Sequence, residues 1–272
     1  MKLMTGTSWM AVAVGALALG ATPAAGAAPS SHSHGSHPAP AKLEIDHIMI
    51  HVAPGAAERA ALERAGFTIA PGVNQHEGQG SASITVELAN GFFELTWRDT
   101  SVSVSPGLEK IAQRFERMGQ WRTSGWAPFG IGLRRGRSAP DSLPFATRSV
   151  RGPWMPPGAS LEIISAASDT AGPRLWVVPR AMVANGIPET DSEKRRLAQK
   201  ESFVHANHAR VITAVKVTAP AGALTPATEL VADYSPVVFA RGSAWLLEIT
   251  FDGGRSGVTK DLRPDLPILC HL

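Results

Sequence analysis

The sequence predicts an α+β fold in which two βαβββ modules pair and form a half-barrel around a pocket. The first observation behind this prediction is a strand–helix–strand–strand–strand pattern over residues 43–99. The second is that such a module, with one crossover helix and tight turns, cannot bury both faces of its sheet alone. The third is a partial repeat of the pattern at residues 205–252, which we expect to be an eroded second module.

The first strand and the helix of module one are marked by their hydrophobic patterns and by the residues that end them. Residues 43–52 alternate between apolar and polar side chains and stop at Pro54 and Gly55, which predicts a strand followed by a turn. Residues 56–65 contain Ala, Leu, Glu and Arg and no β-branched side chain, which favours a helix. Gly66 follows at the position of a left-handed helix cap.

The remaining three strands of module one follow the helix. Apolar and β-branched residues bounded by turn residues predict them, and Asn90-Gly91 is a favoured two-residue hairpin turn. The expected elements are strands at residues 67–70, 81–88 and 92–97, with a glycine-rich loop at residues 72–80 between the first two.

The expected second module matches module one at both ends. Its first strand, residues 210–218, leads into an Ala-Pro pair, as does the first strand of module one. Its last strand repeats an apolar-apolar-Glu-apolar-Thr pattern, which occupies residues 92–96 and 246–250. Residues 224–232 suit the intervening helix, but only about a dozen residues separate them from the last strand. We therefore expect this module to be one strand short.

Residues 100–204 form a long insertion between the modules, too long for a bare loop. We expect this strand-containing insertion to extend the sheet and to wall off the pocket, while residues 253–272 form a C-terminal tail. The expected elements of the insertion are a helix at residues 108–118, strands at residues 130–135, 160–165 and 175–178, and a charged surface segment at residues 189–201.

The first 42 residues predict export and are excluded from the fold. Residues 1–27 combine a positive Lys2, an apolar run too short to span a bilayer and an Ala-Gly-Ala site, which together indicate a signal peptide cleaved after Ala27. An uncleaved membrane anchor is the alternative. Residues 28–42 are rich in Ser, His, Pro and Gly and predict a disordered tether. We expect a periplasmic or extracellular protein with no stable membrane insertion after cleavage.

Charge and cysteine content narrow the classes of partner and of chemistry. The formal net charge of +3 comes from scattered basic residues, with two short clusters at residues 134–137 and 194–196 that suit a solvated surface. Together with export, this argues against a nucleic-acid partner. Cys270 is the only cysteine, so no internal disulfide holds the fold. The sequence has no Gly-x-Ser-x-Gly motif, and we do not expect nucleophilic catalysis.

Four short segments carry a family resemblance by their order and spacing. They are Glu-Ile-Asp-His-Ile-Met-Ile at residues 44–50, Ala-Gly-Phe-Thr at 65–68, His-Glu-Gly-Gln-Gly at 76–80 and Gly-Phe-Phe-Glu-Leu at 91–95. They resemble the glyoxalase-like branch of the vicinal-oxygen-chelate superfamily over residues 43–99. The segment His205-Ala206-Asn207 is similar to the His-Pro-Asn lead-in of that branch. The resemblance implies paired βαβββ modules around a small-molecule pocket.

In that superfamily the first and last strands of each module supply the ligands of one divalent metal. The resemblance therefore nominates His47 and Glu94 from module one and Glu248 from module two. The fourth position falls on Thr213, whose side chain rarely binds a divalent metal, and His205 could take its place. One imidazole and two carboxylates suit Zn, Mn, Fe or Ni.

A structural role is the alternative for these residues, and the protein then binds no metal. In this interpretation His47 hydrogen-bonds its neighbours inside the barrel, while Glu94 and Glu248 pair with arginines or water. His51 lies on the same strand face as His47, and we expect it at the solvated end of the strand.

Aromatic and loop residues are expected to line the pocket. Aromatic side chains on the strands at residues 92–97 and 175–178 can stack on an apolar ligand, and the glycine-rich loop forms a flexible lip. The expected pocket residues are His76, Gln79, Phe93, Trp97, Trp176 and Asn207.

Two functions follow from these expectations. The first is a metal-dependent lyase, isomerase or dioxygenase-type enzyme that acts on a small oxygenated compound, with Glu94 or Glu248 as the catalytic carboxylate that shuttles a proton. The second is a metal-free protein that binds and sequesters a small apolar or aromatic molecule. Thr213 favours the second function, whereas the retained His, Glu and Glu set favours the first. Both take a small-molecule ligand, and both are compatible with a homodimer.

Overall fold

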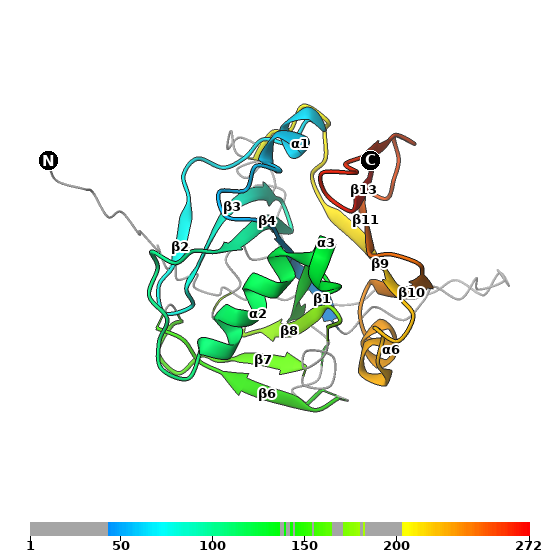
Figure 1. Cartoon of the computed structure of the whole chain (residues 1–272). Coiled ribbons are helices and arrows are strands. Elements are labelled where there is room, and N and C mark those ends of the chain that lie inside the picture. Colours follow the sequence, from blue (N-terminus) through cyan, green and yellow to red (C-terminus); the bar gives the residue numbers. More distant parts are fainter. Residues whose placement is uncertain are drawn as a thin grey trace, which may run out of the picture. The chain divides into compact units, whose positions relative to one another are not determined.

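The computed structural model describes residues 43–136, 139, 142–143, 145–153, 155–164, 171–179, 182 and 203–272. The expected signal peptide at residues 1–27, the tether at residues 28–42 and the charged segment at residues 189–201 lie outside the described residues. The described residues form two β-sheets and few helices, which confirms the α+β class (Figure 1). No helix in these ranges is long and apolar enough to cross a membrane.

The first sheet has eight strands. In spatial order they are β2, β3, β4, β1, β5, β8, β7 and β6. Their bounds are β1 Leu43–His51, β2 Asn74–His76, β3 Ser81–Leu88, β4 Gly91–Arg98, β5 Phe129–Arg135, β6 Thr147–Val150, β7 Leu161–Ile164 and β8 Arg174–Val178. The helices of this part of the chain are α1 Arg59–Arg64, α2 Glu109–Gly119 and α3 Trp121–Ser124.

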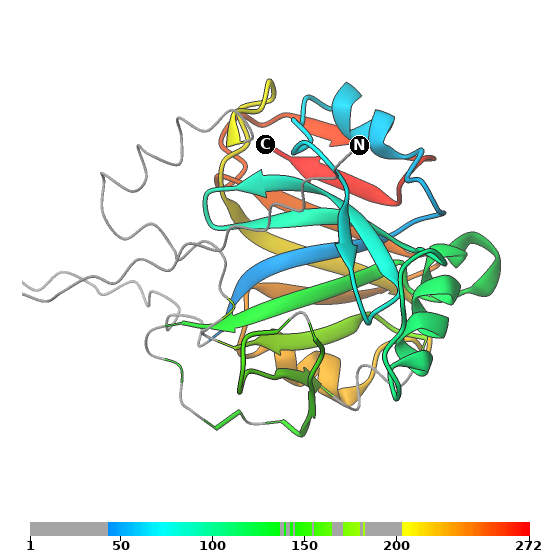
Figure 2. The ribbon, with the colours of Figure 1, turned by 90° about the vertical axis from the view of Figure 1, so that its left-hand side faces the viewer.

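The first sheet consists of two halves with the same strand order. In one half β1 pairs with β4 in parallel, and β3 and β2 follow in antiparallel. In the other half β5 pairs with β8 in parallel, and β7 and β6 follow in antiparallel. The halves join where β1 pairs with β5 in antiparallel, the blue and green strands that lie side by side in Figure 2. The second copy of the strand order therefore lies at residues 129–178, inside the region that we expected to be an insertion.

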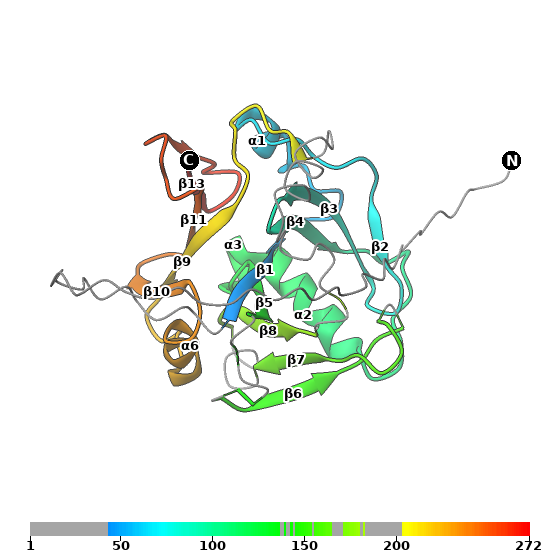
Figure 3. The ribbon, with the colours of Figure 1, turned by 180° about the vertical axis from the view of Figure 1, so that it is seen from behind.

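Residues of the expected second module belong to a separate, five-stranded sheet. Its strand order is β10, β9, β11, β13 and β12. Its elements are β9 Ile212–Pro220, α6 Pro226–Ala232, β10 Val237–Gly242, β11 Leu246–Phe251, β12 Thr259–Asp261 and β13 Ile268–His271, with α6 beside β10 (Figure 3). Up to β11 this segment has three strands and one helix, one strand fewer than a complete module. Residues 253–272, expected to be a tail, instead add β12 and β13 to the sheet.

Local sequence signals located most elements to within a few residues. β3 has the expected bounds, and the turn after it leads into β4. Helix α1 is shorter than expected, and Gly66 follows it with a φ of 89°, the left-handed conformation predicted for a cap. Residues 67–70 form no strand; β3 pairs instead with β2, which lies inside the expected glycine-rich loop. Strand β6 was not predicted.

Alternate residues of β4 face opposite sides of the first sheet. Phe93, Leu95 and Trp97 belong to the main apolar core. The ring of Phe93 lies 5.1 Å from that of Phe67 and 6.4 Å from that of Phe251 on β11. This core therefore joins the two sheets.

The opposite side of the first sheet is covered by α2, and we call it the α2 face. Phe115 of α2 is wholly buried in an apolar cluster with Met49 of β1 and Trp176 of β8. Figure 1 shows α2 lying across these two strands. The buried residues Ala112, Phe115 and Met118 recur at helical spacing, which gives α2 one apolar side for this contact.

Candidate functional site

The α2 face carries two of the residues expected to bind a metal. In the register of β1 and β4, His47 stands beside Phe92. Two residues further along, Met49 stands beside Glu94. Because side chains two apart on a strand share a face, His47 and Glu94 both belong to the α2 face.

His47 is held by contacts on several sides. Its Nδ1 lies 2.6 Å from Oδ1 of Asp46, and its ring is stacked on that of Phe92 with centroids 4.6 Å apart. Nη1 of Arg134 lies 3.7 Å from the other carboxylate oxygen of Asp46. The carboxylate therefore fixes the proton on Nδ1 of His47. Nε2 has no hydrogen-bond partner among the described residues, so it is the atom that can accept a hydrogen bond from a ligand.

Two glycines on β5 allow Trp176 to reach His47. Gly132 stands opposite His47 on β5, and Trp176 stands opposite Gly132 on β8. A Cβ atom at residue 132 would lie 2.7 Å from Cε1 of His47 and 3.0 Å from Nε1 of Trp176. A Cβ atom at Gly130 would lie 2.8 Å from Cζ3 of Trp176. The indole thus lies across β5, in the space that side chains of β5 would otherwise occupy.

Glu94 is buried without a polar partner. It is 6% exposed, and its carboxylate makes no hydrogen bond or ion pair within the described part of the chain. Its neighbours in register are Met49 and Thr85. Its carboxylate oxygens are not among the fully buried side-chain atoms that lack a partner, so water or a donor of a ligand can reach them.

Glu248 lies on the other sheet and is already paired. Its Oε1 is 2.7 Å from Nζ of Lys216, and its Oε2 is 3.3 Å from Nε2 of His271. The hydrogen bond from Lys216 holds the pKa of Glu248 below its ordinary value. Thr213, the expected fourth position, donates its hydroxyl to the carbonyl of Thr250. Among the described residues, no group of three or more His, Cys, Asp or Glu side chains is placed to hold a metal. The structure therefore does not bring Glu248 together with His47 and Glu94.

His205 uses both ring nitrogens to attach its loop to module one. Nε2 donates to the carbonyl of Glu87 at 2.9 Å, and Nδ1 accepts from the amide of Thr68 at 3.1 Å. Burial lowers the pKa of His205, which keeps the ring neutral and suits this pattern. Neither nitrogen is left to bind a metal.

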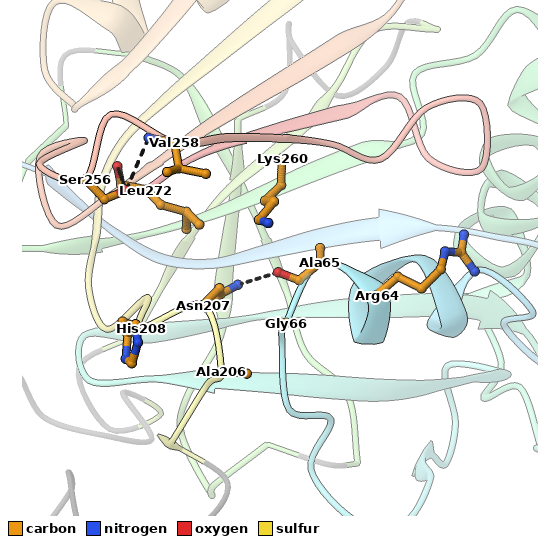
Figure 4. Close-up of a pocket in the computed structure, with 10 residues that line it drawn as sticks. All are labelled: Arg64, Ala65, Gly66, Ala206, Asn207, His208, Ser256, Val258, Lys260 and Leu272. Carbon is orange, nitrogen blue, oxygen red and sulfur yellow. Dashed lines mark hydrogen bonds between the residues drawn. The ribbon is translucent and has the colours of Figure 1, made fainter.

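Asn207 has a similar structural role, at the edge of an open pocket of about 400 Å³. Its side chain donates to the carbonyl of Ala65 at 3.0 Å and accepts from the amide of Ala209 at 3.0 Å. Figure 4 shows the pocket, whose lining residues are Arg64, Ala65, Gly66, Ala206, Asn207, His208, Ser256, Val258, Lys260 and Leu272. None of them belongs to the α2 face, so this pocket is separate from His47 and Glu94.

The other residues expected in the pocket are divided between two faces. Trp176 lies on the α2 face, 5.1 Å from the ring of His47. Phe93 and Trp97 lie on the opposite side, in the core between the sheets, because they alternate with Glu94 along β4. Nδ1 of His76 and Nε2 of Gln79 each lie 3.0 Å from the hydroxyl of Ser81.

Sequence reasoning missed several residues of the α2 face. His51 is wholly buried rather than solvated, and its ring lies 4.7 Å from that of Phe115. Arg174 stands two residues before Trp176 and therefore shares its face. Strand alternation was the available signal: it places Phe92 beside Glu94 and excludes Phe93. The pairing of β1 with β5, which brings Gly132 to His47, has no local signal.

Comparisons with known proteins show a distant structural similarity and no family. No family model matches it, and no curated protein matches it. One similar structure is the crystal structure of a hypothetical protein from Staphylococcus aureus. The match covers 84% of this chain and 98% of that chain, with 12% sequence identity and a TM-score of 0.40. A likeness at this level carries no argument about function.

Proposed function

We propose that this chain is an exported glyoxalase-like protein that binds a small apolar or aromatic molecule without a metal. In this proposal the eight-stranded sheet is the half-barrel, and the ligand lies on its α2 face. The order of the two halves of the sheet and the four sequence segments that resemble the family support the assignment. Function follows from the residues on this face rather than from the fold, because one fold serves many chemistries.

The residues at the second pair of ligand positions carry the metal-free proposal. The resemblance implies metal ligands from the first and last strands of each half, and in the second half these strands are β5 and β8. His47 and Glu94 are offset by two residues in the register of β1 and β4. The pairs with the same offset on β5 and β8 are Gly130 with Trp176 and Gly132 with Val178, and neither pair offers a metal ligand. His47 and Glu94 alone are fewer than the three protein ligands of a typical catalytic zinc site. The described residues therefore do not fit a catalytic metal centre.

The same positions suit an apolar ligand. The rings of Trp176 on β8, His47 on β1 and Phe92 on β4 follow one another, and the Trp176 ring reaches over β5. The centroid separations are 5.1 Å from Trp176 to His47 and 4.6 Å from His47 to Phe92. Aromatic surfaces with a few polar groups are typical of small-molecule sites. Nε2 of His47 and the carboxylate of Glu94 are the polar groups that would orient the ligand.

A metal-dependent lyase, isomerase or dioxygenase-type enzyme is the second candidate, and one contact favours it. Asp46 holds Nδ1 of His47, as a carboxylate often does for a metal-binding or proton-accepting histidine. The contact also suits a histidine that only accepts a hydrogen bond from a ligand, so it does not outweigh the glycine and tryptophan positions.

Metal analysis separates these two functions. We expect purified full-length protein to contain substoichiometric metal, and its melting temperature to stay unchanged on addition of Zn, Mn, Fe, Ni or a chelator. The melting temperature of Glu94→Gln should likewise stay unchanged on addition of these metals or a chelator. Stoichiometric metal in the wild type that is lost in Glu94→Gln, together with a chelator-sensitive melting temperature, would refute the metal-free proposal. Glu248→Gln is the matched control, since its carboxylate is paired on the other sheet.

Export makes a separate prediction. We expect the mature protein to begin near Ala28, because the Ala-Gly-Ala site follows the apolar run within the usual reach of signal peptidase. Intact-mass spectrometry of protein recovered from the producing cells measures this. Protein that retains Met1 and fractionates with membranes would instead indicate an uncleaved anchor.

A further inference from the structure

Arg174 is a buried cation that has no acceptor in the described part of the chain. It opens β8 and is 7% exposed, and its guanidinium lies 5.4 Å from the ring centroid of Phe115 and 5.5 Å from that of Trp176. It makes no hydrogen bond or ion pair with any residue that the structure describes. A guanidinium has five N–H donors, and the small exposed part of this side chain leaves it accessible to an acceptor from outside the fold. The two rings stabilise the charge but accept no conventional hydrogen bond.

No carboxylate that the structure describes forms an ion pair with Arg174. Glu94 lies in the same row of the sheet, but β5 and β1 stand between β8 and β4. Three strand spacings place their backbones about 14 Å apart. The nearby charges are positive instead: burial, and then Arg114 of α2 and Arg148 of β6, lower the pKa of Arg174 to about 9.

His51 adds unsatisfied polar atoms next to this cation. Its ring packs on Phe115, which also contacts Arg174, and both ring nitrogens are buried without a partner among the described residues. Burial, and then the charges of Arg174 and Arg114, lower the pKa of His51 to about 3. The ring is therefore neutral at physiological pH and offers one N–H donor.

Two hydroxyl groups continue the row from His51. Thr96 stands beside His51 in register, and Ser83 stands beside Thr96. Both side chains are fully buried, and neither hydroxyl has a hydrogen-bond partner in the described ranges. An unsatisfied buried polar group costs about 1–3 kcal/mol, and these lie together on one face. Thr96 and Ser83 lie on β4 and β3, three and four strand spacings from β8, so the groups that meet near Arg174 are those of His51 and Phe115. A cation beside an N–H donor favours an acceptor that carries negative charge.

We propose that Arg174 and His51 bind the carboxylate of a small aromatic ligand whose ring lies against Trp176 and His47. This inference rests on the proposed binding function and specifies its ligand. The guanidinium fork matches the two oxygens of a planar carboxylate. The guanidinium of Arg174 lies 5.5 Å from the ring centroid of Trp176, so the anion site borders the aromatic surface. A small aromatic carboxylate can therefore contact both.

Calorimetric titration of the full-length protein tests this with naphthoate and its neutral analogue naphthamide. We expect naphthoate to bind at least about tenfold more tightly. Arg174→Met keeps the apolar stem and removes the charge, and should weaken naphthoate about 10- to 100-fold while changing naphthamide less than about twofold. Arg122→Met is the matched control, since Arg122 is exposed and bonds to the carbonyls of Pro264 and Asp265. It should change neither affinity.

The outcomes distinguish the ligand class from the binding function. If neither compound binds the wild type, the proposed function fails, and this inference with it. If both bind equally well and Arg174→Met changes neither affinity, only the anion site is refuted. Inorganic phosphate that competes with naphthoate but not with naphthamide would support the anion site. If circular dichroism shows that Arg174→Met is unfolded, Arg174→Lys keeps a charge without the fork. It should weaken naphthoate severalfold, and unchanged affinity would refute the proposal.

Discussion

Replacing Phe115 with alanine is expected to lower the free energy of unfolding by about 3–5 kcal/mol. Phe115 is wholly buried and is the residue of α2 that contacts both His51 and Arg174. Its removal leaves a cavity between α2 and the sheet, and exposes a cation and an imidazole that depend on its ring. A loss of this size is a large share of the total stability of an ordinary domain.

Urea denaturation followed by circular dichroism measures the effect of Phe115→Ala. Ile111→Ala on the same helix is the matched control, because Ile111 is only partly buried at the edge of the apolar cluster, and it should cost clearly less. We also expect Phe115→Ala to weaken naphthoate binding, since α2 then covers the anion site poorly. A loss below about 1 kcal/mol would mean that α2 does not hold this face closed.

Replacing Gly132 with valine is expected to abolish ligand binding and to destabilise the protein by about 1–3 kcal/mol. Any Cβ atom at this position meets His47 on one side and Trp176 on the other. His47 cannot move away, because the ring of Phe92 is stacked on its opposite side at an interplanar angle of 3°. The indole must therefore leave β5, and the aromatic surface proposed for the ligand is lost.

Calorimetry with naphthamide, which needs no anion site, measures the loss caused by Gly132→Val. Ile131→Val is the matched control: Ile131 is the preceding residue of β5 and belongs to the core between the sheets. It should cost about 0.5–1.5 kcal/mol in stability and leave the affinity unchanged. Full naphthamide affinity in Gly132→Val would place the ligand elsewhere.

The misplaced repeat shows the limit of a local pattern. β4 and β11 share the apolar-apolar-Glu-apolar-Thr pattern, and each is an interior strand with partners on both sides. The shared pattern reports that common environment. It does not report which strands are the partners, because pairing depends on residues far apart in the sequence. The true counterpart of module one, β5 to β8, lacks the pattern and has Gly130 opposite Met49 and Gly132 opposite His47.

Some residues of the candidate site could likewise be predicted from the sequence, and others could not. The family resemblance nominated His47 and Glu94 together, and the register of β1 and β4 puts them on one face. Trp176, expected to line the pocket, lies 5.1 Å from the ring of His47. Strand alternation, applied strictly, would have excluded Phe93 and Trp97. That Arg174 has no acceptor among the residues that the structure describes could not be predicted, because a missing partner is a property of the surroundings and leaves no mark in the sequence.

The sequence by itself determined the α+β class, the bounds of β3, and the helices near residues 59–64 and 109–119. These follow from backbone periodicity and turn chemistry, which act over a few residues. Only the tertiary structure decided that β5 joins β1, that His47 and Glu94 share a face, that Trp176 lies against His47, that Glu248 pairs with Lys216 and that Arg174 has no acceptor among the described residues. These depend on strand pairing and burial, which arise from contacts between distant parts of the chain.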